Sequence, residues 1–334
     1  MNDRAAAETG DSVHTKQIYA EDIHPGDRID DTFLVIEKNM ASSQKGNPYL
    51  ALKLRDKTGD VDGRVWDNAV VLNDRFRKGD VIRLQARAIS YRNIIQLSIA
   101  DLEPVDESRF NPADYFPSSK MDTEEMFTAL MAFVETMETE PLKALLEEIF
   151  HDKDIAVAFK NAPAAKGFHH FYIGGLLEHT LSVVQLLDKV AAHYGETQRD
   201  LIIAGGILHD IGKTRELSFS KMIEYTDEGR LIGHIMLGIE MVNEKMALIE
   251  DFPPQLAMEL RHIMLSHHGV LEYGSPKRPK TLEALIVNFV DDLDAKVNAF
   301  QTSIENATDR ESDWTPYHRL LERFIYKGNS SPDE

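Results

Sequence analysis

The sequence of 334 residues contains no cysteine and no long apolar run. Without cysteine, disulfide bonds, thiolate metal ligands and a cysteine nucleophile are excluded, so any bound metal must use nitrogen and oxygen ligands. No stretch reaches the roughly 18 consecutive apolar residues of a membrane-spanning helix, and Met1–Thr15 lacks the apolar segment of a signal peptide. We therefore expect a cytoplasmic protein that does not associate with a membrane.

Basic residues are also scarce, but the shortage is uneven. The chain has 37 Lys and Arg against 56 Asp and Glu, a net charge of -19. Residues 1–105 hold 15 basic and 17 acidic side chains, whereas residues 106–334 hold 22 and 39. From Lys38 to Arg92 the balance is reversed, with 12 basic and 6 acidic residues. A phosphate-binding surface is therefore compatible with the N-terminal part, and cation-binding acidic clusters are compatible with the rest.

Residues 16–105 consist of short apolar runs separated by turn signals, and the chain length favours two domains. These runs predict five strands with a short helix, Ala69–Phe76, after the third. The expected strands are Thr32–Ile36, Tyr49–Leu54, Val61–Trp66, Val81–Ala86 and Ile94–Ile99. This order is that of an OB barrel, an all-β fold. Residues 1–15 show no apolar period, and we expect them to be disordered.

In OB barrels, single-stranded nucleic acid lies across the second and third strands and their loops, held by aromatic and basic side chains. The candidate contacts are Lys45, Tyr49, Lys53, Arg55, Arg64, Trp66, Arg87, Tyr91 and Arg92. A second interpretation stays open, because Tyr49 and Trp66 could pack in the barrel core or at its rim. Alternating Lys and Arg could likewise form an ordinary solvated face. In combination they favour single-stranded RNA or DNA as a partner.

Helix-breaking residues separate the barrel from the rest of the chain. Residues 106–121 include Asn111-Pro112 and Phe116-Pro117, and we expect them to form a linker. From Asp122 onward, apolar residues recur at helical spacing. Residues 122–328 are therefore predicted to form an all-α domain, followed by a disordered tail, residues 329–334.

The most informative stretch of this second domain is the hexapeptide Leu208–Lys213, which follows the apolar run Leu201–Ile207. It places an imidazole, that of His209, beside the carboxylate of Asp210. We expect Gly212 to adopt the left-handed conformation that ends a helix, which leaves both side chains in the last helical turn. An adjacent His and Asp at a buried helix end suggest a metal site.

Histidines are concentrated around this stretch, with ten of the 13 between residues 151 and 268. Several buried, uncompensated imidazoles would be costly, and a shared metal centre explains their concentration. His179 lies on the apolar stripe of a predicted helix and is expected to point inward. The roles of His169, His170 and His262 stay open between support of the ligands, substrate contact and packing.

A further ligand is expected from the helix that begins at Thr281. Asp292 continues the spacing of Leu285 and Phe289, so we expect it to face the interior, and Asp291 is nearly as well placed. The predicted ligands form two sets that Asp210 could bridge, namely His179, His209, Asp210 and Asp292 for one ion, and His234, His267 and His268 for a second.

Two ions roughly 3.5–4 Å apart suit phosphodiester cleavage, because they generate hydroxide at neutral pH and clamp the attacking and leaving oxygens. We therefore predict metal-assisted phosphoester hydrolysis with Asp210, Lys213 and His234 as catalytic residues. Lys213 could hold a substrate phosphate or could simply complement a helix C-terminus. Side chains of His and Asp accept Mn, Fe, Co, Ni or Zn, so the residues alone do not select the metal.

Together these motifs resemble the HD-domain phosphohydrolases, whose defining pattern is the same series of His, His-Asp and Asp. Over residues 164–327 the chain further resembles the YhaM-type 3′→5′ exoribonucleases. The segments that carry the resemblance are His169–Thr180, Leu208–Lys213, Gly233-His234, His267–Pro276, Asp291–Lys296 and Tyr317–Gly328. Members of that family carry an OB domain before the HD domain, which is also the order predicted here from strands and helices.

The resemblance implies a divalent-metal exonuclease, usually activated by Mn²⁺, that releases nucleoside 5′-monophosphates from the 3′ end of single-stranded RNA and, in some members, DNA. It implies as core ligands His179, His209, Asp210 and Asp292, with a second metal site completed by His234, His267 and His268. Related cyclic-dinucleotide phosphodiesterases carry a Gly-Tyr-Pro signature. This chain has Tyr273–Pro276 instead, which argues against a cyclic-dinucleotide substrate.

Two other functions stay open at this point. A nucleotide phosphohydrolase of the HD class would use the same metal centre without needing the barrel. A non-enzymatic single-strand binding module would need the barrel but not the metal centre. The residues indicate neither a preference between RNA and DNA nor an interface for a homo-oligomer.

Overall fold

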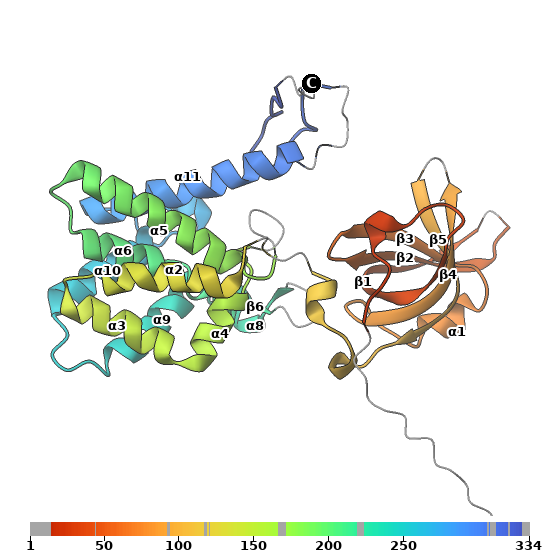
Figure 1. Ribbon diagram of the computed structural model, residues 1–334, viewed down its shortest axis with the longest axis horizontal. Coiled ribbons are helices and arrows are strands. Elements are labelled where there is room, and N and C mark those ends of the chain that lie inside the picture. The colour runs from red at the N-terminus through yellow and green to blue at the C-terminus, as the bar shows by residue number, and fades with distance from the viewer. Residues whose placement is uncertain are drawn as a thin grey trace, which may run out of the picture. The chain divides into compact units, whose positions relative to one another are not determined.

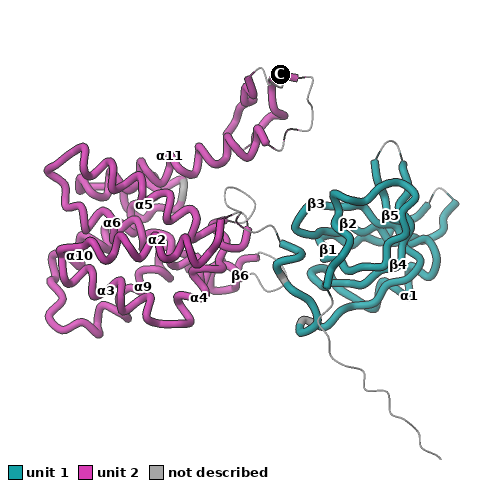
Figure 2. The backbone as a smooth tube through the Cα atoms, in the orientation of Figure 1, with its two compact units in different colours: residues 1–118, 220–222 teal, residues 119–219, 223–334 magenta. Residues whose placement is uncertain are grey.

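The computed structural model describes residues 15–43, 45–91, 94–116, 119, 121–165, 172–218, 224–305, 307, 312–319 and 321–328. The chain divides between residues 118 and 119 into two compact units (Figure 2). Residues 1–14 and 329–334, which belong to the predicted disordered ends, lie outside the described residues. The same holds for three residues singled out above, Arg92, His169 and His170.

The first unit is a closed five-stranded barrel, which confirms the predicted OB fold (Figure 1). Its elements are η1 (Ala20–Asp22), β1 (Arg28–Ser42), β2 (Pro48–Asp56), β3 (Gly59–Val65), α1 (Ala69–Asn73), β4 (Val81–Tyr91) and β5 (Ile94–Pro104). Around the barrel the strands follow the order β1-β2-β3-β5-β4, and only β3 and β5 run parallel. The long strand β1 pairs with both β2 and β4 and shifts register between Val35 and Glu37. Such a bulge bends a strand and helps a sheet to close.

Strand β2 shows why the sequence pattern predicts the barrel. Leu50, Leu52 and Leu54 are buried in the interior, whereas the residues between them are only partly buried. This alternation follows from the two-residue period of a strand, which turns successive side chains to opposite faces. The outward face of β2 therefore carries Tyr49 and Lys53, two of the predicted nucleic-acid contacts.

The predicted linker, residues 106–121, is shorter than expected. It begins with the 3-10 turns η2 (Glu107–Arg109) and η3 (Pro112–Asp114), after which Tyr115 is buried against the barrel. The Tyr115 hydroxyl donates to Thr32 Oγ1 at 2.6 Å, and its burial raises the pKa of that hydroxyl. The chain up to residue 116 thus belongs to the first unit, because its aromatic residues find buried positions there.

The second unit is helical, as predicted, apart from one small two-stranded sheet. Its elements are α2 (Thr123–Glu135), α3 (Glu140–His151), α4 (Lys153–Asn161), α5 (Gly175–Tyr194), α6 (Arg199–Leu208), α7 (Lys213–Glu216), β6 (Leu217–Ser218), β7 (Glu224–Tyr225), α8 (Asp227–Leu231), α9 (His234–Met246), α10 (Pro254–Ser266), η4 (Leu271–Tyr273) and α11 (Leu282–Glu305). Within the described residues, no helix is both long enough and apolar enough to cross a membrane.

Helix α6 lies at the centre of this unit, in contact with α5, α10 and α11 (Figure 1). All of its residues from Leu201 to Leu208 are buried. At Gly206 a Cβ atom would lie 2.4 Å from Leu187 Cδ1 of α5, so a larger residue there would require the Leu187 side chain to shift. The central position of α6 matters because the His-Asp pair stands at its C-terminal end.

Candidate metal centre

His209 caps the C-terminus of α6, and Asp210 follows it directly. The Nδ1 atom of His209 donates to the carbonyl oxygen of Gly206 at 2.8 Å. Because a carbonyl can only accept, the Nε2 atom is the nitrogen that remains for a ligand. Both side chains are buried, so the helix end holds an imidazole and a carboxylate in fixed positions away from bulk water.

Gly212 has a different role from the one expected. Its φ is -65°, so the prediction that it ends α6 in a left-handed conformation is wrong. A Cβ atom here would lie only 1.9 Å from the carbonyl oxygen of His234. The glycine thus permits the N-terminus of α9 to pack directly on this stretch. That close approach brings His234 to Asp210.

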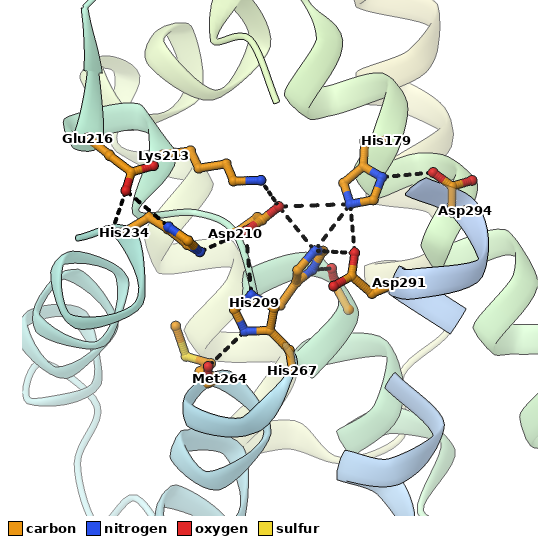
Figure 3. A network of polar contacts seen from close by, with 11 residues as sticks. His179, His209, Asp210, Lys213, Glu216, His234, Met264, His267, Asp291 and Asp294 are labelled. Carbon is orange, nitrogen blue, oxygen red and sulfur yellow. Dashed lines mark hydrogen bonds and ion pairs between the residues drawn. The ribbon is translucent and has the colours of Figure 1, made fainter. Parts of the chain in front are cut away.

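His179 reaches the centre from α5 and is fully buried, as its place on the apolar stripe predicted. Its Nδ1 atom donates to Asp294 Oδ2 at 2.8 Å, and the hydroxyl of Ser182 donates to the other oxygen of that carboxylate. With Nδ1 fixed, Nε2 points to His209 and lies 3.3 Å from its Nε2 atom (Figure 3). Two imidazole nitrogens that face each other at this distance can share one cation.

The aspartate that α11 contributes is Asp291, and the prediction of Asp292 is wrong. Asp291 Oδ1 lies 3.1 Å from His179 Nε2, whereas Asp292 is exposed and paired with Lys296 at 2.6 Å. The error is one of helical phase. Phe289, which was expected to face the interior, is 63% exposed, and Val287 and Val290 are buried in its place.

His234 is the first residue of α9, and Glu216 determines its orientation. A single carboxylate oxygen, Glu216 Oε1, accepts from the backbone N–H of His234 at 3.0 Å and from its Nδ1 at 3.1 Å. The Nε2 atom then lies 3.5 Å from Asp210 Oδ1. A carboxylate that holds the far nitrogen of an imidazole is the usual arrangement behind a metal-binding histidine.

His267 and His268 follow directly on α10. The Nδ1 atom of His267 donates to the carbonyl of Met264 at 2.8 Å, and its Nε2 lies 3.7 Å from Asp210 Oδ1. The ring of His268 stands 4.2 Å from that of His267 and 5.1 Å from that of His234, measured between centroids. The three imidazoles thus surround the same oxygen of Asp210.

Asp210 joins two groups of ligands (Figure 3). Its Oδ2 atom lies 3.3 Å from His209 Nε2 and 3.8 Å from His179 Nε2, while Oδ1 faces His234 and His267. In each group, the ligand atoms lie within 4.8 Å of one another: His179, His209 and Asp210 in the first, and Asp210, His234, His267 and His268 in the second. Asp210 would therefore be shared by the two groups if each held a cation.

The donor set fits divalent metal. Among the described residues, three buried atoms of this centre have no hydrogen-bond partner, namely Asp210 Oδ1, His234 Nε2 and His267 Nε2. Buried polar atoms are seldom left without a hydrogen bond, because each such atom costs free energy. These three atoms lie close together, since both nitrogens are near Asp210 Oδ1. Cations would satisfy all three, and neutral imidazole with carboxylate is the donor set that first-row divalent metals accept.

The titration behaviour of the centre reflects its burial and its mixed charges. Burial opposes a charged imidazole at His179, yet hydrogen bonds to Asp291 and Asp294 raise its pKa to about 9. For His267, burial and the neighbouring His268 hold the pKa well below the usual value. Burial also opposes ionisation of Asp210, but the nearby Lys213 ammonium holds the pKa of that carboxyl well below its ordinary value. The centre therefore holds ionised carboxylate at neutral pH.

Lys213 is buried at the edge of the centre. Its Nζ atom donates to Asp210 Oδ2 at 2.6 Å. Burial alone would favour the neutral amine, but Asp210 raises the pKa of Lys213, which keeps the ammonium charged. A buried cation beside the ligands is suited to binding a phosphate oxygen.

The sequence did not identify the two supporting carboxylates, and of the three histidines whose roles it left open only His262 lies within the described residues. Asp294 lies three residues after Asp291, so the helical period could have placed both on one face. Glu216 carries no such signal, because only the fold brings it to His234. His262 lies outside the centre and accepts from the backbone N–H of Lys280 at 2.9 Å, a role in positioning that loop.

On the barrel, the predicted contacts are not all equally available. Tyr49 lies on the outward face of β2 and Trp66 just after β3, and the centroids of their rings are 4.7 Å apart. Trp66 is 49% exposed. The alternative of a core position for Trp66 is therefore excluded. Lys45, in the loop after β1, and Arg87, on β4, are exposed, as is Tyr91.

The other basic candidates are partly neutralised by acidic neighbours on β3. Lys53 and Arg55 both approach Asp60, at 3.4 Å and 2.6 Å, and Arg64 lies 3.9 Å from Asp62. Exposed pairs of this kind are weak and exchange readily with other partners. These side chains can still reach a phosphate, at the expense of the ion pairs that they form.

Comparison with known proteins finds a family model for the helical unit and relatives over most of the chain. The HD domain family model matches residues 176–296. The 3′-5′ exoribonuclease YhaM of Bacillus subtilis (strain 168) is 31% identical over 283 residues, which cover 84% of this chain and 88% of the relative. The 3′-5′ exoribonuclease YhaM of Geobacillus sp. (strain WCH70) is 30% identical over 303 residues, or 90% of this chain and 92% of the relative. The second OB-fold domain of replication protein A from Methanococcus maripaludis covers 27% of this chain and 94% of that structure, with 18% identity and a TM-score of 0.22.

Proposed function

Because the chain belongs to the family of the YhaM 3′-5′ exoribonucleases, we propose that it removes nucleoside 5′-monophosphates from the 3′ end of single-stranded RNA, using divalent metal. The observation that carries the proposal is the convergence of four imidazole Nε2 atoms on one buried carboxylate, Asp210. No ordinary packing role requires this arrangement. A cytoplasmic location is part of the proposal, since RNA is turned over there.

The ligand sets are proposed as follows. His179, His209, Asp210 and Asp291 would hold one ion, and Asp210, His234, His267 and His268 would hold the other. Manganese is the metal proposed, with Fe, Co, Ni and Zn as the alternatives that the donor set accepts. Ions bound in this way promote hydroxide formation near neutral pH and stabilise charge on the phosphate oxygens.

The residues around the ions would orient the ligand side chains and offset the charge of the phosphate. Asp294 and Glu216 fix the rings of His179 and His234, so that the ligand atoms need little reorganisation. The Lys213 ammonium binds a non-bridging oxygen of the scissile phosphate and offsets its charge. Its contact with Asp210 keeps the side chain extended toward the centre when no substrate is present.

The barrel is proposed to bind the strand upstream of its 3′ end. Bases would stack on the half-buried ring of Tyr49 and the exposed ring of Trp66, while Lys45 and Arg87 would contact phosphates. Neither kind of contact reads a particular base, which suits an enzyme that removes nucleotides one after another. Single-stranded DNA offers the same stacking surface and phosphates, and it is therefore tested beside RNA.

The direct test incubates the full-length chain with 5′-labelled single-stranded RNA and Mn²⁺. We expect a ladder that shortens from the 3′ end, with nucleoside 5′-monophosphates as the product. Metal analysis of the purified protein should find two ions per chain. Intact RNA beside hydrolysed free nucleotides would support a nucleotide phosphohydrolase instead, and RNA that is bound but never cleaved with any of the five metals would indicate a binding module.

Asp210→Asn is the matched variant, because it keeps the shape of the side chain and removes the bridging charge. Loss of the metal contribution, several kcal/mol, should lower turnover by about 10³-fold or more. Binding of RNA to the barrel, measured without divalent metal, should be unchanged. Retained cleavage by this variant would contradict the proposed role of the centre.

A further inference from the structure

A small hairpin follows helix α11 near the C-terminus of the chain (Figure 1). We define the C-terminal hairpin as residues 312–319 and 321–328. Its two arms are joined by antiparallel bridges, one between Trp314 and Tyr326 and one between His318 and Arg323. None of these residues contributes to the metal centre, so the hairpin has no role in the function proposed so far.

One face of the hairpin is anchored to the helical unit. Leu321 and Ile325 are buried and form a small apolar cluster with Ala299 and Phe300 of α11. Thr315 is also buried, and its backbone N–H donates to the carbonyl of Ile325 at 2.9 Å. The side chains of both arms that lie outside this cluster and are exposed to solvent form the opposite face of the hairpin.

That opposite face is aromatic. Its four aromatic side chains are between 50% and 58% exposed and form two ring pairs, Trp314 with Tyr326 and Tyr317 with Phe324. The centroids lie 5.1 Å and 5.2 Å apart, with interplanar angles of 57° and 69°. Rings that meet at such angles do not cover each other's faces fully, so flat ring surfaces stay open to a further stacking partner.

The charge of the hairpin differs from that of the unit to which it belongs. Residues 312–328 carry three basic residues, Arg319, Arg323 and Lys327, against two acidic ones. The rest of residues 106–334 carries 19 basic against 37 acidic residues. Arg319 and Arg323 are exposed, and Arg323 directly precedes Phe324 in the chain. The hairpin therefore repels a polyanion less than the average surface of its unit does.

We propose that the C-terminal hairpin is a second binding surface for single-stranded nucleic acid, with bases stacked on the aromatic pairs and phosphates bound by Arg319 and Arg323. Exposed rings beside guanidinium groups are the chemistry that binds unpaired bases without sequence preference. The barrel presents the same combination at Tyr49 and Trp66. The inference rests on the proposed function, since it assumes that the substrate is a single strand.

The alternative for these rings is a purely structural one, because cross-strand aromatic pairs also stabilise hairpins. Leucine separates the two roles, since it keeps apolar contact across the hairpin but has no flat face for a base. The informative variants of the full chain are therefore Trp314→Leu with Tyr326→Leu, and Tyr317→Leu with Phe324→Leu. Tyr194→Leu is the matched control, because Tyr194 is equally exposed in the same unit but lies at the end of α5.

Binding is measured as the fluorescence anisotropy of labelled oligouridylate in EDTA, which prevents cleavage. All variants are also made in a background with Tyr49→Ala and Trp66→Ala, so that the barrel does not mask the hairpin. Each Leu pair should weaken binding by about tenfold in that background, the loss expected for one stacked base. Arg319→Gln and Arg323→Gln should each lower the salt dependence of log K by about 0.7. The control should bind like its parent.

The other results are each decisive. Unchanged RNA affinity in both Leu pairs would overturn the inference, and unchanged affinity with a shifted sedimentation coefficient would identify the hairpin as an interface between copies of the chain. Thermal unfolding and hydrolysis of a small phosphodiester with Mn²⁺ should match the parent protein. A parent protein that fails to bind any single strand would overturn the proposed function itself, which is a different outcome from variants that bind as well as their parent.

Discussion

The candidate metal centre and the outward face of the barrel are both proposed to bind phosphate groups, but their side chains are held in opposite ways. At the centre, His179, His209 and His267 are wholly buried, and the second nitrogen of each ring is held by a carboxylate or a carbonyl. On the barrel, Trp66 is half-exposed and Arg55 forms an exposed ion pair with Asp60. The first region is buried and its rings are held by hydrogen bonds, whereas the second is open to solvent and its ion pairs can exchange.

The difference follows from what each region has to do. Bond cleavage requires ligand atoms to be fixed within fractions of an ångström, and burial makes each charge more effective because water does not screen it. Binding along a strand of any sequence requires contacts that many bases can make in turn. Substitutions should therefore have large effects at the centre and small, additive effects on the barrel. Four changes test that contrast.

The largest effect is expected at Asp291, next to a natural control. Asp291→Asn removes a charged ligand 3.1 Å from His179 Nε2 and should lower turnover by about 10²-fold or more. Asp292→Asn should leave turnover within about twofold, because Asp292 only forms an exposed pair with Lys296. The measurement is the initial rate of RNA shortening at saturating Mn²⁺. A larger loss for Asp292→Asn than for Asp291→Asn would reverse the assignment.

These two neighbouring residues also show how far the sequence predicts the molecule. The barrel strands are predictable because burial alternates along β2, and the His-Asp pair is predictable because the motif is contiguous. Asp291 and Asp292 are not separable in this way, since a shift of one residue rotates a helix by about 100°. Large apolar residues on α11, such as Phe289, remain exposed, so assigning them to the buried face gives the wrong helical phase.

Other parts of the centre could not be predicted because they depend on tertiary contacts. Glu216 supports His234 across 18 residues of sequence, and nothing in the intervening chain specifies that contact. Gly212 was expected to end a helix, whereas it is needed because the backbone of α9 passes too close for a Cβ atom. Local patterns predict elements and motifs, but the side chains that orient the ligands become visible only in the fold.

The second prediction concerns Asp294, which touches His179 but is not a ligand. Asp294→Asn weakens the hold on His179 Nδ1 and should lower Mn²⁺ affinity by about 10- to 100-fold, the usual effect of losing such a carboxylate. Isothermal titration with Mn²⁺ measures this directly. Ser182→Ala, which removes only the hydroxyl bound to the same carboxylate, should have a smaller effect in the same direction. Equal affinity in Asp294→Asn and the parent would mean that burial alone orients the ring.

The third prediction is a pH dependence of metal binding. In the metal-free protein His179 has a pKa of about 9 and is protonated below that pH. An ion must displace this proton from Nε2, so Mn²⁺ affinity should rise by up to about tenfold per pH unit toward pH 9 and then level off. The pKa values of Asp210 and Asp291 are lowered and that of His267 is well below neutral, so none of them should contribute in this range. Titration in buffers of different ionisation enthalpy counts the released proton, and an affinity independent of pH would contradict the assignment of that proton to His179.

The smallest effect is expected on the barrel. Trp66→Ala removes one half-exposed stacking surface and should weaken binding of oligouridylate by about fivefold, near the lower end for a stacked base. Tyr49→Ala should behave similarly, and the two together should be nearly additive unless the 4.7 Å ring pair binds one base as a unit. Anisotropy in EDTA gives the affinities, and hydrolysis of a small phosphodiester should not change. A loss of that hydrolysis in either variant would mean that the barrel face is coupled to the metal centre, and the contrast between a buried region and an exchangeable one would no longer hold.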